Sequence, residues 1–373
     1  MAKRRGHGEG SIYQRKDGRY AAAVTLENRK RKYFYGETRR EVQEKLKVAL
    51  HEQQQGTLVT SPQQSLKQFL EQWVEQVCEP TLRITTYVQY RSVVHHHLIP
   101  AFGHISLQKL TPEMIQAFYR KKLDEGKKPG TVGFIHAVLR RALGDAVRWG
   151  LVMRNVAKLV TIPHVERREA QVLTAEQAKK LLEVARSSSL DALLVLALTT
   201  GMRRGEILAL RWSDVDLVHG MLFIRRTMTR VGGYGLVENE AKTKSSRRRI
   251  VLSAVVVEAF KRHQAQQEQV KVAVGAGWQD KGIVFPDKDG GLWSPDRMVR
   301  RFDKLLKQIG LPHMHFHDLR HSAATILLAA GVHPKKVQEL LGHSSITITM
   351  DVYSHVLPSM QQDVADEMDN LFG

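Results

Sequence analysis

The sequence has a single cysteine, Cys78, among 373 residues. One thiol cannot close an intramolecular disulfide, which excludes a disulfide framework and fits a reducing cytoplasm. Long apolar runs are missing too, since the best one, residues 190–200, is too short to span a bilayer and indicates a buried helix. The first residues, MAKRRGHGEG, lack the apolar segment of a signal peptide. We therefore expect a cytoplasmic location and no membrane partner.

Signatures of cofactor chemistry are also absent. The sequence contains no phosphate-binding glycine-rich loop with Lys and Ser or Thr, and no carboxylate cluster suited to magnesium. Three histidines at 95–97 are consecutive, so on a helix they point in different directions and cannot share one ion. We expect no cofactor and no bound metal.

Acidic residues are few relative to basic ones. Asp and Glu total 38 against 57 Lys and Arg, a formal net charge of +19 that is spread along the chain. Basic folded surfaces of this kind fit a polyanion such as nucleic acid, although a basic surface without a specific partner is the alternative. With 42% hydrophobic residues, a chain of this length is expected to form two or three domains with real cores.

Residues 1–60 predict a small sheet followed by a helix. Strands are expected at 11–15, 19–26 and 30–35, with Asp17 and Gly18 as a hairpin turn and Thr38 and Glu41 as a capping box. Basic and aromatic residues share this sheet, which suits insertion into a DNA groove. The alternative is an ordinary solvent-exposed sheet face with the same residue types. The candidates for DNA binding are Arg15, Arg19, Lys30 and Arg31, and the aromatic residues beside them are Tyr13, Tyr20, Tyr33 and Tyr35.

Residues 65–165 follow a helical pattern and predict a compact α-bundle without a catalytic set. A first helix begins near residue 66, and a second is expected from about 85 to 97, where Pro100 should stop it. Thr111 and Pro112 open a third helix, and Gly150 follows a fourth. Polar stretches at 56–64 and about 161–169 indicate linkers on either side of this bundle.

Residues 170–373 mix helices with short strands. Gly201 ends the apolar helix, so Arg203 lies in a turn where backbone amides and a guanidinium can converge on an anion. A strand is expected at 221–226, and a hairpin is expected from 236–241 and 248–252, whose loop holds Lys242, Lys244 and Arg247. Further helices are expected at 296–308, 318–330 and 334–341, followed by an acidic tail with one apolar side.

One short stretch near the C-terminus carries the chemistry. His317 and Arg320 are three residues apart, so on a helix they share a face that can hold a phosphate. Tyr353 follows soon after and is a residue type that can attack such a phosphate and become covalently attached to it.

Five motifs occur in the order TGMRRGE, AKTKSSRR, HDLRH, LLGHSS and DVYSH. In this order they closely resemble those of the tyrosine site-specific recombinases, with phage and conjugative-element integrases as the nearest subgroup. The resemblance covers residues from about 170 to 360. It implies a multidomain, mainly α-helical protein with small β-sheets, in three parts: an arm-type DNA-binding module at 1–60, a core-DNA-binding helical bundle at 65–165 and an α+β catalytic domain at 170–373.

The resemblance also implies roles for single residues. Arg203 and Arg320 match the two arginines that clamp the phosphate, and Glu206 matches the acidic residue that supports the first of them. The active-site histidines correspond to His317 and His343, the hairpin lysine to Lys242 with Lys244 as its rival, and the nucleophile to Tyr353.

The implied reaction is DNA strand cleavage and rejoining through a 3′-phosphotyrosyl intermediate, which integrates or excises a mobile element such as a viral genome. The bond energy is kept in that intermediate, so neither metal nor nucleotide is required. The implied partners are double-stranded DNA with core-type and arm-type sites, three further copies of the chain in a tetramer on DNA, and, less directly, a directionality factor and a host DNA-bending protein. The implied location is the cytoplasm of a bacterial host.

Three other functions fit parts of the sequence. A non-catalytic DNA-binding regulator explains the charge but not the set of catalytic residue types, and covalent trapping on DNA would distinguish it. A type IB topoisomerase shares the chemistry, and an assay for strand exchange would decide. A metallohydrolase would use histidines 313, 315, 317 and 321, of which His317 and His321 have ligand spacing, and sensitivity to EDTA would reveal it.

Overall fold

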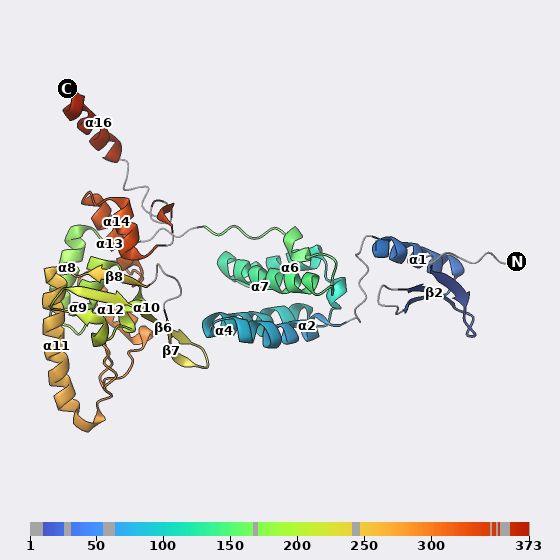
Figure 1. Cartoon of the computed structure of the whole chain (residues 1–373), viewed down its shortest axis with the longest axis horizontal. Coiled ribbons are helices and arrows are strands. Elements are labelled where there is room, and N and C mark those ends of the chain that lie inside the picture. The colour runs from blue at the N-terminus through green and yellow to red at the C-terminus, as the bar shows by residue number, and fades with distance from the viewer. Residues whose placement is uncertain are drawn as a thin grey trace. The chain divides into compact units, whose positions relative to one another are not determined.

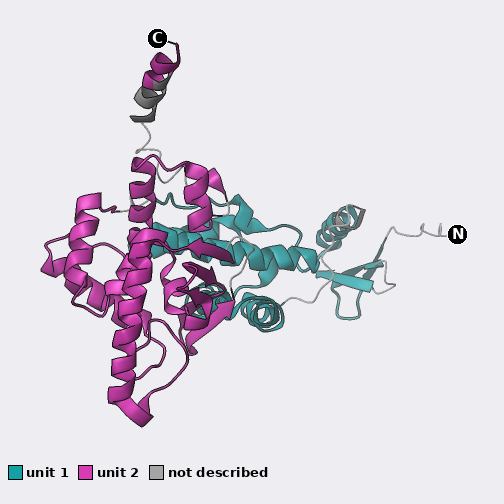
Figure 2. Ribbon diagram, turned by 60° about the vertical axis from the view of Figure 1, so that its left-hand side comes forward, with its two compact units in different colours: residues 1–166 teal, residues 167–373 magenta. Residues whose placement is uncertain are grey.

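The computed structural model describes residues 10–25, 31–54, 64–166, 171–240, 247–343, 345–347, 350 and 359–372. The chain divides into two compact units, residues 1–166 and 167–373 (Figures 1 and 2). The boundary between them falls in the polar stretch that the sequence predicts as a linker. None of the described helices is long and apolar enough to cross a membrane.

The first unit begins with an antiparallel sheet whose strand order is β1-β2-β3. Its strands are β1 (Ser11–Gln14), β2 (Tyr20–Thr25) and β3 (Arg31–Gly36), and α1 (Arg39–Gln54) follows. Gly18 adopts a left-handed φ of 83° in the turn between β1 and β2. One face of the sheet, with Ala22 and Val24, packs against α1 through Val42 and Leu46. The sheet and its helix are confirmed as the sequence predicts them.

A helical bundle fills the rest of the first unit. Its helices are α2 (Leu66–Trp73), α3 (Glu79–Thr81), α4 (Ile84–Val93), α5 (Ile99–Phe102), α6 (Pro112–Asp124) and α7 (Pro129–Arg148). Thr111 caps α6 with Pro112 at its first position, as predicted. The core surrounds Trp73, which is fully buried and donates a 2.6 Å hydrogen bond from its indole nitrogen to Asp145.

The prediction that Pro100 stops the second helix of the bundle is wrong. A π-helical turn, Val94–Leu98, follows α4 and continues directly into α5, which contains Pro100. The same arrangement occurs one helix earlier, where the π turn Val74–Cys78 leads into α3 with Pro80. A proline lacks the N–H that a regular helix would use, and the wider turn accommodates that change of hydrogen-bond register.

The second unit is built around the apolar helix α9 (Asp191–Thr200), in which eight of ten residues are buried. This explains why the segment is apolar all round and has no polar face. It packs against α8 (Ala175–Ala185), α11 (Ala254–Val274) and α13 (Asp318–Ala329). Further helices of the described residues include α10 (Arg204–Leu208), α12 (Pro295–Gln308), α14 (Pro334–Leu341) and α16 (Ser359–Phe372).

The strands of the second unit pair differently from the prediction. Instead of a hairpin of 236–241 with 248–252, β7 (Gly235–Glu240) pairs with β6 (Arg226–Val231), and β8 (Arg248–Val251) pairs with β5 (Met221–Ile224). Strand β4 (Val215–Asp216) completes the sheet β4-β5-β8. Gly233 and Gly235, at φ of 79° and 75°, form the tight turn that joins β6 to β7. That local hairpin leaves β8 to pair with β5.

Candidate active site

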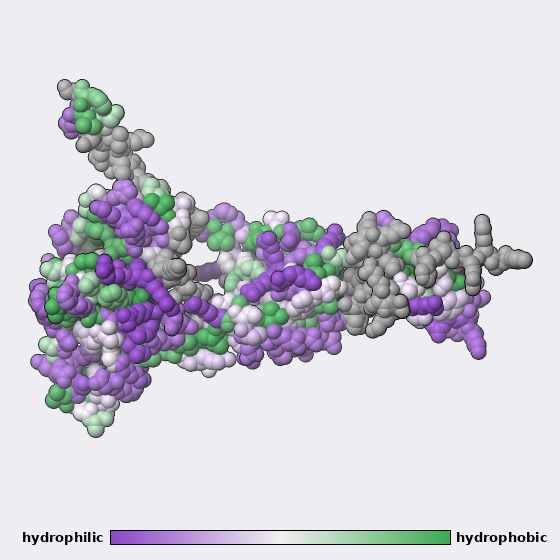
Figure 3. All heavy atoms as spheres, viewed as in Figure 1, coloured by the Kyte–Doolittle hydropathy of each residue, from purple (hydrophilic) through white to green (hydrophobic). Residues whose placement is uncertain are grey.

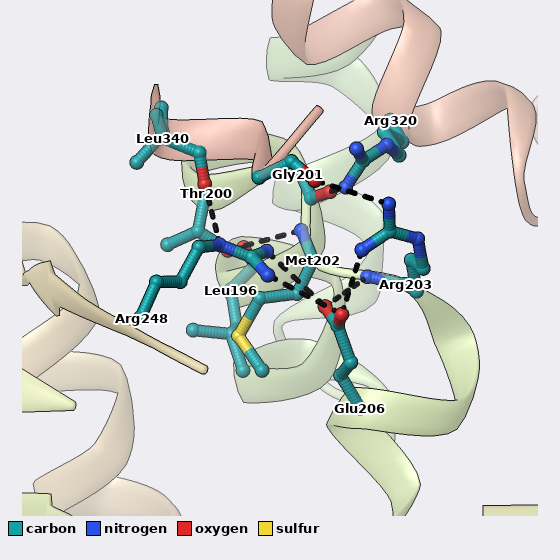
Figure 4. A network of polar contacts seen from close by, with 10 residues as sticks. Leu196, Thr200, Gly201, Met202, Arg203, Glu206, Arg248, Arg320 and Leu340 are labelled. Carbon is teal, nitrogen blue, oxygen red and sulfur yellow. Dashed lines mark hydrogen bonds and ion pairs between the residues drawn. The ribbon is translucent and has the colours of Figure 1, made fainter. Parts of the chain in front are cut away.

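The first site arginine is held at the end of α9. Gly201 ends that helix in the left-handed conformation, at φ 60°, and Arg203 stands two residues later as the N-cap of α10. Its backbone N–H and its Nη1 each donate a 2.9 Å hydrogen bond to the carboxylate of Glu206. Its Nη2 donates to the carbonyl oxygen of Gly342, at 3.3 Å. The guanidinium is therefore fixed by two separate segments (Figure 4).

Glu206 accepts hydrogen bonds from a second arginine, which sequence reasoning missed. Arg248 on β8 donates from Nη1 and Nη2 to the two carboxylate oxygens, at 3.3 and 3.1 Å (Figure 4). Burial by itself would raise the pKa of Glu206, but the charges and hydrogen bonds of Arg248 and Arg203 outweigh it and lower that pKa. The carboxylate is therefore ionised at neutral pH.

The second predicted phosphate-clamping arginine comes from α13. Arg320 is only 3% exposed, and its Nη1 donates a 2.8 Å hydrogen bond to the carbonyl oxygen of Gly201. Because Gly201 immediately precedes the segment with Arg203, this bond brings the two arginines to the same place (Figure 4). Two guanidinium groups converging in this way form an anion-binding site.

The two predicted histidines lie at helix ends beside these arginines. His317 is the N-cap of α13, and His343 follows Gly342, the left-handed residue that ends α14. Burial, followed by the charge of Arg320 and then of Arg203, lowers the pKa of His343 to about 4. Burial and the neighbouring His321, Arg320 and Arg203 likewise lower the pKa of His317 to about 4. His317 is nevertheless exposed to solvent, whereas His343 is half-buried, so water screens these charges more at His317 and the lowered pKa is better supported at His343.

The structure thus brings Arg203, Glu206, His317, Arg320 and His343 together, from three helices, α10, α13 and α14, and the turns that flank them. Lys242, Lys244 and Tyr353 lie outside the described residues, as does Lys30 of the N-terminal candidates. The one addition is Arg248. The sequence hints at a buried arginine here through the run Arg247-Arg248-Arg249 in a strand. Alternate residues of a strand face opposite sides, so at least one of the three arginines must face the interior.

Arg31 and three of the four tyrosines lie on the sheet face opposite α1, whereas Tyr20 packs against the core on the α1 side, contrary to its predicted place beside the basic residues. Tyr13, Tyr33 and Tyr35 are all exposed there, and the rings of Tyr33 and Tyr35 stack at 6.5 Å. The guanidinium of Arg15 lies 5.1 Å from the ring centre of Tyr35, and Arg31 is exposed at the start of β3. Arg19 instead forms an ion pair with Asp17 in the turn. This face is therefore aromatic with a basic rim.

A second basic surface lies on the strands of the C-terminal unit. A groove of about 440 Å³ is lined by five arginines, residues 225, 226, 247, 248 and 249, together with Phe223, Ile224 and Glu240. Arg247 forms an ion pair with Glu240 at its edge. The most hydrophilic side chains on the face in Figure 3 gather over these strands. The groove is basic, although Arg225 and Arg226 form ion pairs with Asp214, and Arg248 forms one with Glu206.

Histidines, cysteines and carboxylates are the side chains that commonly bind metal ions in proteins. Within the described parts of the chain, no three of these residues are grouped so that they could hold an ion. The rings of His317 and His321 lie 5.3 Å apart and meet edge to face.

Comparison with known proteins identifies the family. The model of the family described as "Phage integrase family" matches residues 171–360, about half of the chain. The chain belongs to the phage integrase family. A second model, described as "Phage integrase, N-terminal SAM-like domain", matches residues 65–123, within the helical bundle. The chain is thus a tyrosine-type site-specific recombinase, an integrase of mobile elements.

Whole-length relatives support this membership. The chain is 29% identical over 377 residues to the protein named "Tyrosine recombinase XerC-like" of Caldanaerobacter subterraneus subsp. tengcongensis, which covers 95% of this integrase and 96% of that protein. The integrase of transposon Tn1549, solved with circular intermediate DNA, superposes with a TM-score of 0.68 at 18% identity and covers 82% of this chain and 99% of that one. A lambda integrase tetramer bound to a Holliday junction gives 0.57 at 21% identity, covering 90% and 96%. At these identities the two structures establish the fold.

Proposed function

We propose that this integrase cleaves and rejoins DNA with Tyr353 as the nucleophile and with Arg203, Arg320, His317, His343 and Lys242 as the catalytic residues around the phosphate. The observation that carries this proposal is the convergence of Arg203 and Arg320, each tied by hydrogen bonds to backbone carbonyls of another segment. Guanidinium groups held in this way are organised before the substrate arrives.

The two arginines address the main barrier of the reaction. A phosphodiester is anionic and repels nucleophiles, and more negative charge develops on its non-bridging oxygens in the transition state. Planar guanidinium forks neutralise those oxygens and donate paired hydrogen bonds to them. Glu206 contributes by holding Arg203 and does not itself touch the DNA.

Two proton transfers accompany the exchange of bonds. The oxygen of Tyr353 attacks phosphorus, and its proton passes to His317, whose lowered pKa leaves it neutral and able to accept. The bond from phosphorus to the 5′ oxygen breaks, and Lys242 gives that oxygen a proton. His343 donates a hydrogen bond to a phosphate oxygen. The reverse steps rejoin the strand, and the bond energy stays in the phosphotyrosyl linkage, so no metal, nucleotide or other cofactor is needed.

DNA contacts extend over three parts of the chain in this proposal. The catalytic domain at 170–373 and the helical bundle at 65–165 each contact the core-type site, and the module at 1–60 binds arm-type sites. The exposed tyrosines of β1 and β3 with Arg15, Arg31 and Lys30 would enter a groove of the arm-type site, while Arg19 contributes from the turn. Lys244 and Arg247 would contact the backbone near the cleaved bond. The separate hydrophobic clusters of the sheet module and of the bundle support this division.

Recombination also needs assembly. A lambda integrase has been solved as a tetramer on a Holliday junction. We infer the same homotetramer for this chain, and α16 is a candidate link between its protomers because Met368, Leu371 and Phe372 are exposed. A directionality factor and a host DNA-bending protein would act with it, in the cytoplasm of a bacterial host.

The test is covalent trapping on a nicked suicide substrate, from which the cleaved fragment diffuses away. The protein should form a detergent-resistant adduct with the DNA 3′ end in EDTA and without ATP. Absence of any adduct would remove the catalytic proposal and leave a DNA-binding regulator. Relaxation of supercoiled DNA without strand exchange between two molecules would favour a topoisomerase.

A further inference from the structure

We propose that Arg248 is a positioning residue that orients Arg203 through Glu206 and ties the strand β8 to the segment carrying His343. This inference rests on the proposed function, because it concerns the hydrogen bonds that hold Arg203, the proposed phosphate-clamping arginine, in place. Arg248 itself is not expected to touch the DNA phosphate at the cleaved bond.

The first observation is the geometry of the shared carboxylate. Glu206 is 5% exposed and accepts four hydrogen bonds, two from Arg203 and two from Arg248. Arg248 presents both Nη groups as a fork, so it sets the plane of the carboxylate as well as its position. Each carboxylate oxygen accepts one hydrogen bond from each arginine, so the position of Arg203 follows that of the carboxylate. The orientation of Arg203 therefore depends on a residue that lies behind it.

The second observation is the other end of the same guanidinium. The Nε of Arg248 donates a 2.8 Å hydrogen bond to the carbonyl oxygen of Leu340, in the last turn of α14. That helix ends at Gly342, whose carbonyl accepts from Arg203, and His343 comes next. Arg248 thus uses its two Nη groups to hold Glu206, which supports Arg203, and its Nε to hold the end of α14, which leads to His343 (Figure 4).

The third observation is the contrast with neighbouring arginines. The side chain of Arg248 is 8% exposed, whereas Arg247 and Arg249 on either side of it are exposed. A buried charge is costly unless it is paired and hydrogen-bonded. Among the described residues, Arg248 meets both conditions through Glu206 and the carbonyl oxygen of Leu340. Lysine would keep the charge but, as a point charge on a flexible stem, could not hold a carboxylate plane and a carbonyl at once.

The experiment compares Arg248→Lys with Arg249→Lys, which makes the same change on the exposed face of the same strand. For each protein we would measure the unfolding temperature, the affinity for core-site DNA and the single-turnover rate of covalent complex formation on saturating DNA. Arg248→Lys is expected to slow that rate by about 10- to 100-fold with DNA affinity within about twofold of the parent. Arg249→Lys should match the parent in unfolding temperature and in the rate on saturating DNA. Its DNA affinity is not used as a control, since Arg249 lines the basic groove.

A substrate with a methylphosphonate at the cleaved bond separates positioning from general damage. Replacing one non-bridging oxygen by methyl removes the negative charge that Arg203 neutralises, so a misplaced Arg203 should matter less. The ratio of parent to Arg248→Lys rates should therefore fall toward one on this substrate. In a Glu206→Gln background the lysine change should likewise have little further effect, since the shared carboxylate is already gone.

The outcomes separate the two proposals. If the parent forms no adduct, the catalytic function itself fails. If the parent reacts and Arg248→Lys reacts at the parental rate, the inference is wrong while the function stands. If Arg248→Lys is slow by the same factor on both substrates, Arg248 has only a structural role and the inference is again wrong.

Discussion

Arg320 donates a 2.8 Å hydrogen bond to the carbonyl oxygen of Gly201, across 119 positions of sequence. The bond connects the first turn of α13 to the turn that carries Arg203. Gly201 permits this because it has a left-handed φ of 60° and no side chain: a Cβ there would lie 2.3 Å from a methyl group of Leu341. The relative position of the two arginines therefore depends on a glycine.

Gly201→Ala tests this dependence. The left-handed backbone should cost roughly 1–2 kcal/mol of stability, and the contact with Leu341 should add to it and displace α14. Cleavage of bound DNA should slow as well, since α14 leads to His343. Gly331→Ala is the matched control, because Gly331 has a similar φ of 77° after α13 but no atom within 4 Å of the added Cβ. Equal cleavage rates in the two variants would contradict the account.

Much of the local structure follows from the sequence. Thr111 caps α6 with Pro112 at its first position, and Gly201 ends α9, as the sequence predicts. These signals lie within a few residues of the feature they specify, so short-range chemistry is sufficient to predict them. The site residues are predicted from the resemblance of five ordered motifs to those of a family. That these residues lie close together in space follows from the fold and not from the motifs themselves.

What the sequence did not reveal depends on contacts between distant segments. The role of Arg248 depends on hydrogen bonds to Glu206, 42 positions away in the sequence, and to the carbonyl oxygen of Leu340, 92 positions away. Nothing in the run of three arginines says which one turns inward. The predicted partner of β7 is wrong for a related reason. The sequence predicts no strand at 227–231, where β6 lies, and the glycine turn between β6 and β7 brings these two strands together.

A pH dependence follows from His343. Its pKa is about 4 in the folded DNA-free protein against an ordinary value of 6.5. Between these values the unfolded chain binds a proton that the folded chain does not, so stability falls as pH decreases from 6.5 to 4 and is unaffected by this group above 6.5. His343→Gln should make the unfolding temperature of the C-terminal unit decline less steeply over that range. His315→Gln, at an exposed histidine of the same unit, is the control, and an equal change of slope in both variants would refute this assignment.

The general acid can be assigned by a change in the leaving group. Lys242→Ala should slow cleavage by about 100-fold or more, because the proton donor for the leaving 5′ oxygen is removed. DNA affinity should fall little, since Lys242 is one of many positive charges that contact the DNA. A substrate with sulfur at the bridging 5′ position should restore the rate, since a thiolate leaves without a proton. If Lys244→Ala shows this pattern and Lys242→Ala does not, the assignment within the loop is reversed.

Removal of residues 1–60 tests the modular organisation. The proposed catalytic residues all lie beyond residue 200, so the truncated protein should still form the covalent adduct on core-site DNA. Binding to a second class of sites should be weakened selectively. A truncated protein that folds and binds the core site but cannot cleave it would show that the sheet module is part of the catalytic apparatus.

Tyr353→Phe is the most direct test of the central claim, because phenylalanine keeps the ring and removes only the hydroxyl. The variant should bind core-site DNA as the parent does. On a nicked suicide substrate in EDTA, the parent should form a detergent-resistant adduct whose proteolysis leaves a peptide containing Tyr353 on the DNA 3′ end, and the variant should form none. An adduct at parental levels in Tyr353→Phe would contradict both the nucleophile and the mechanism built on it.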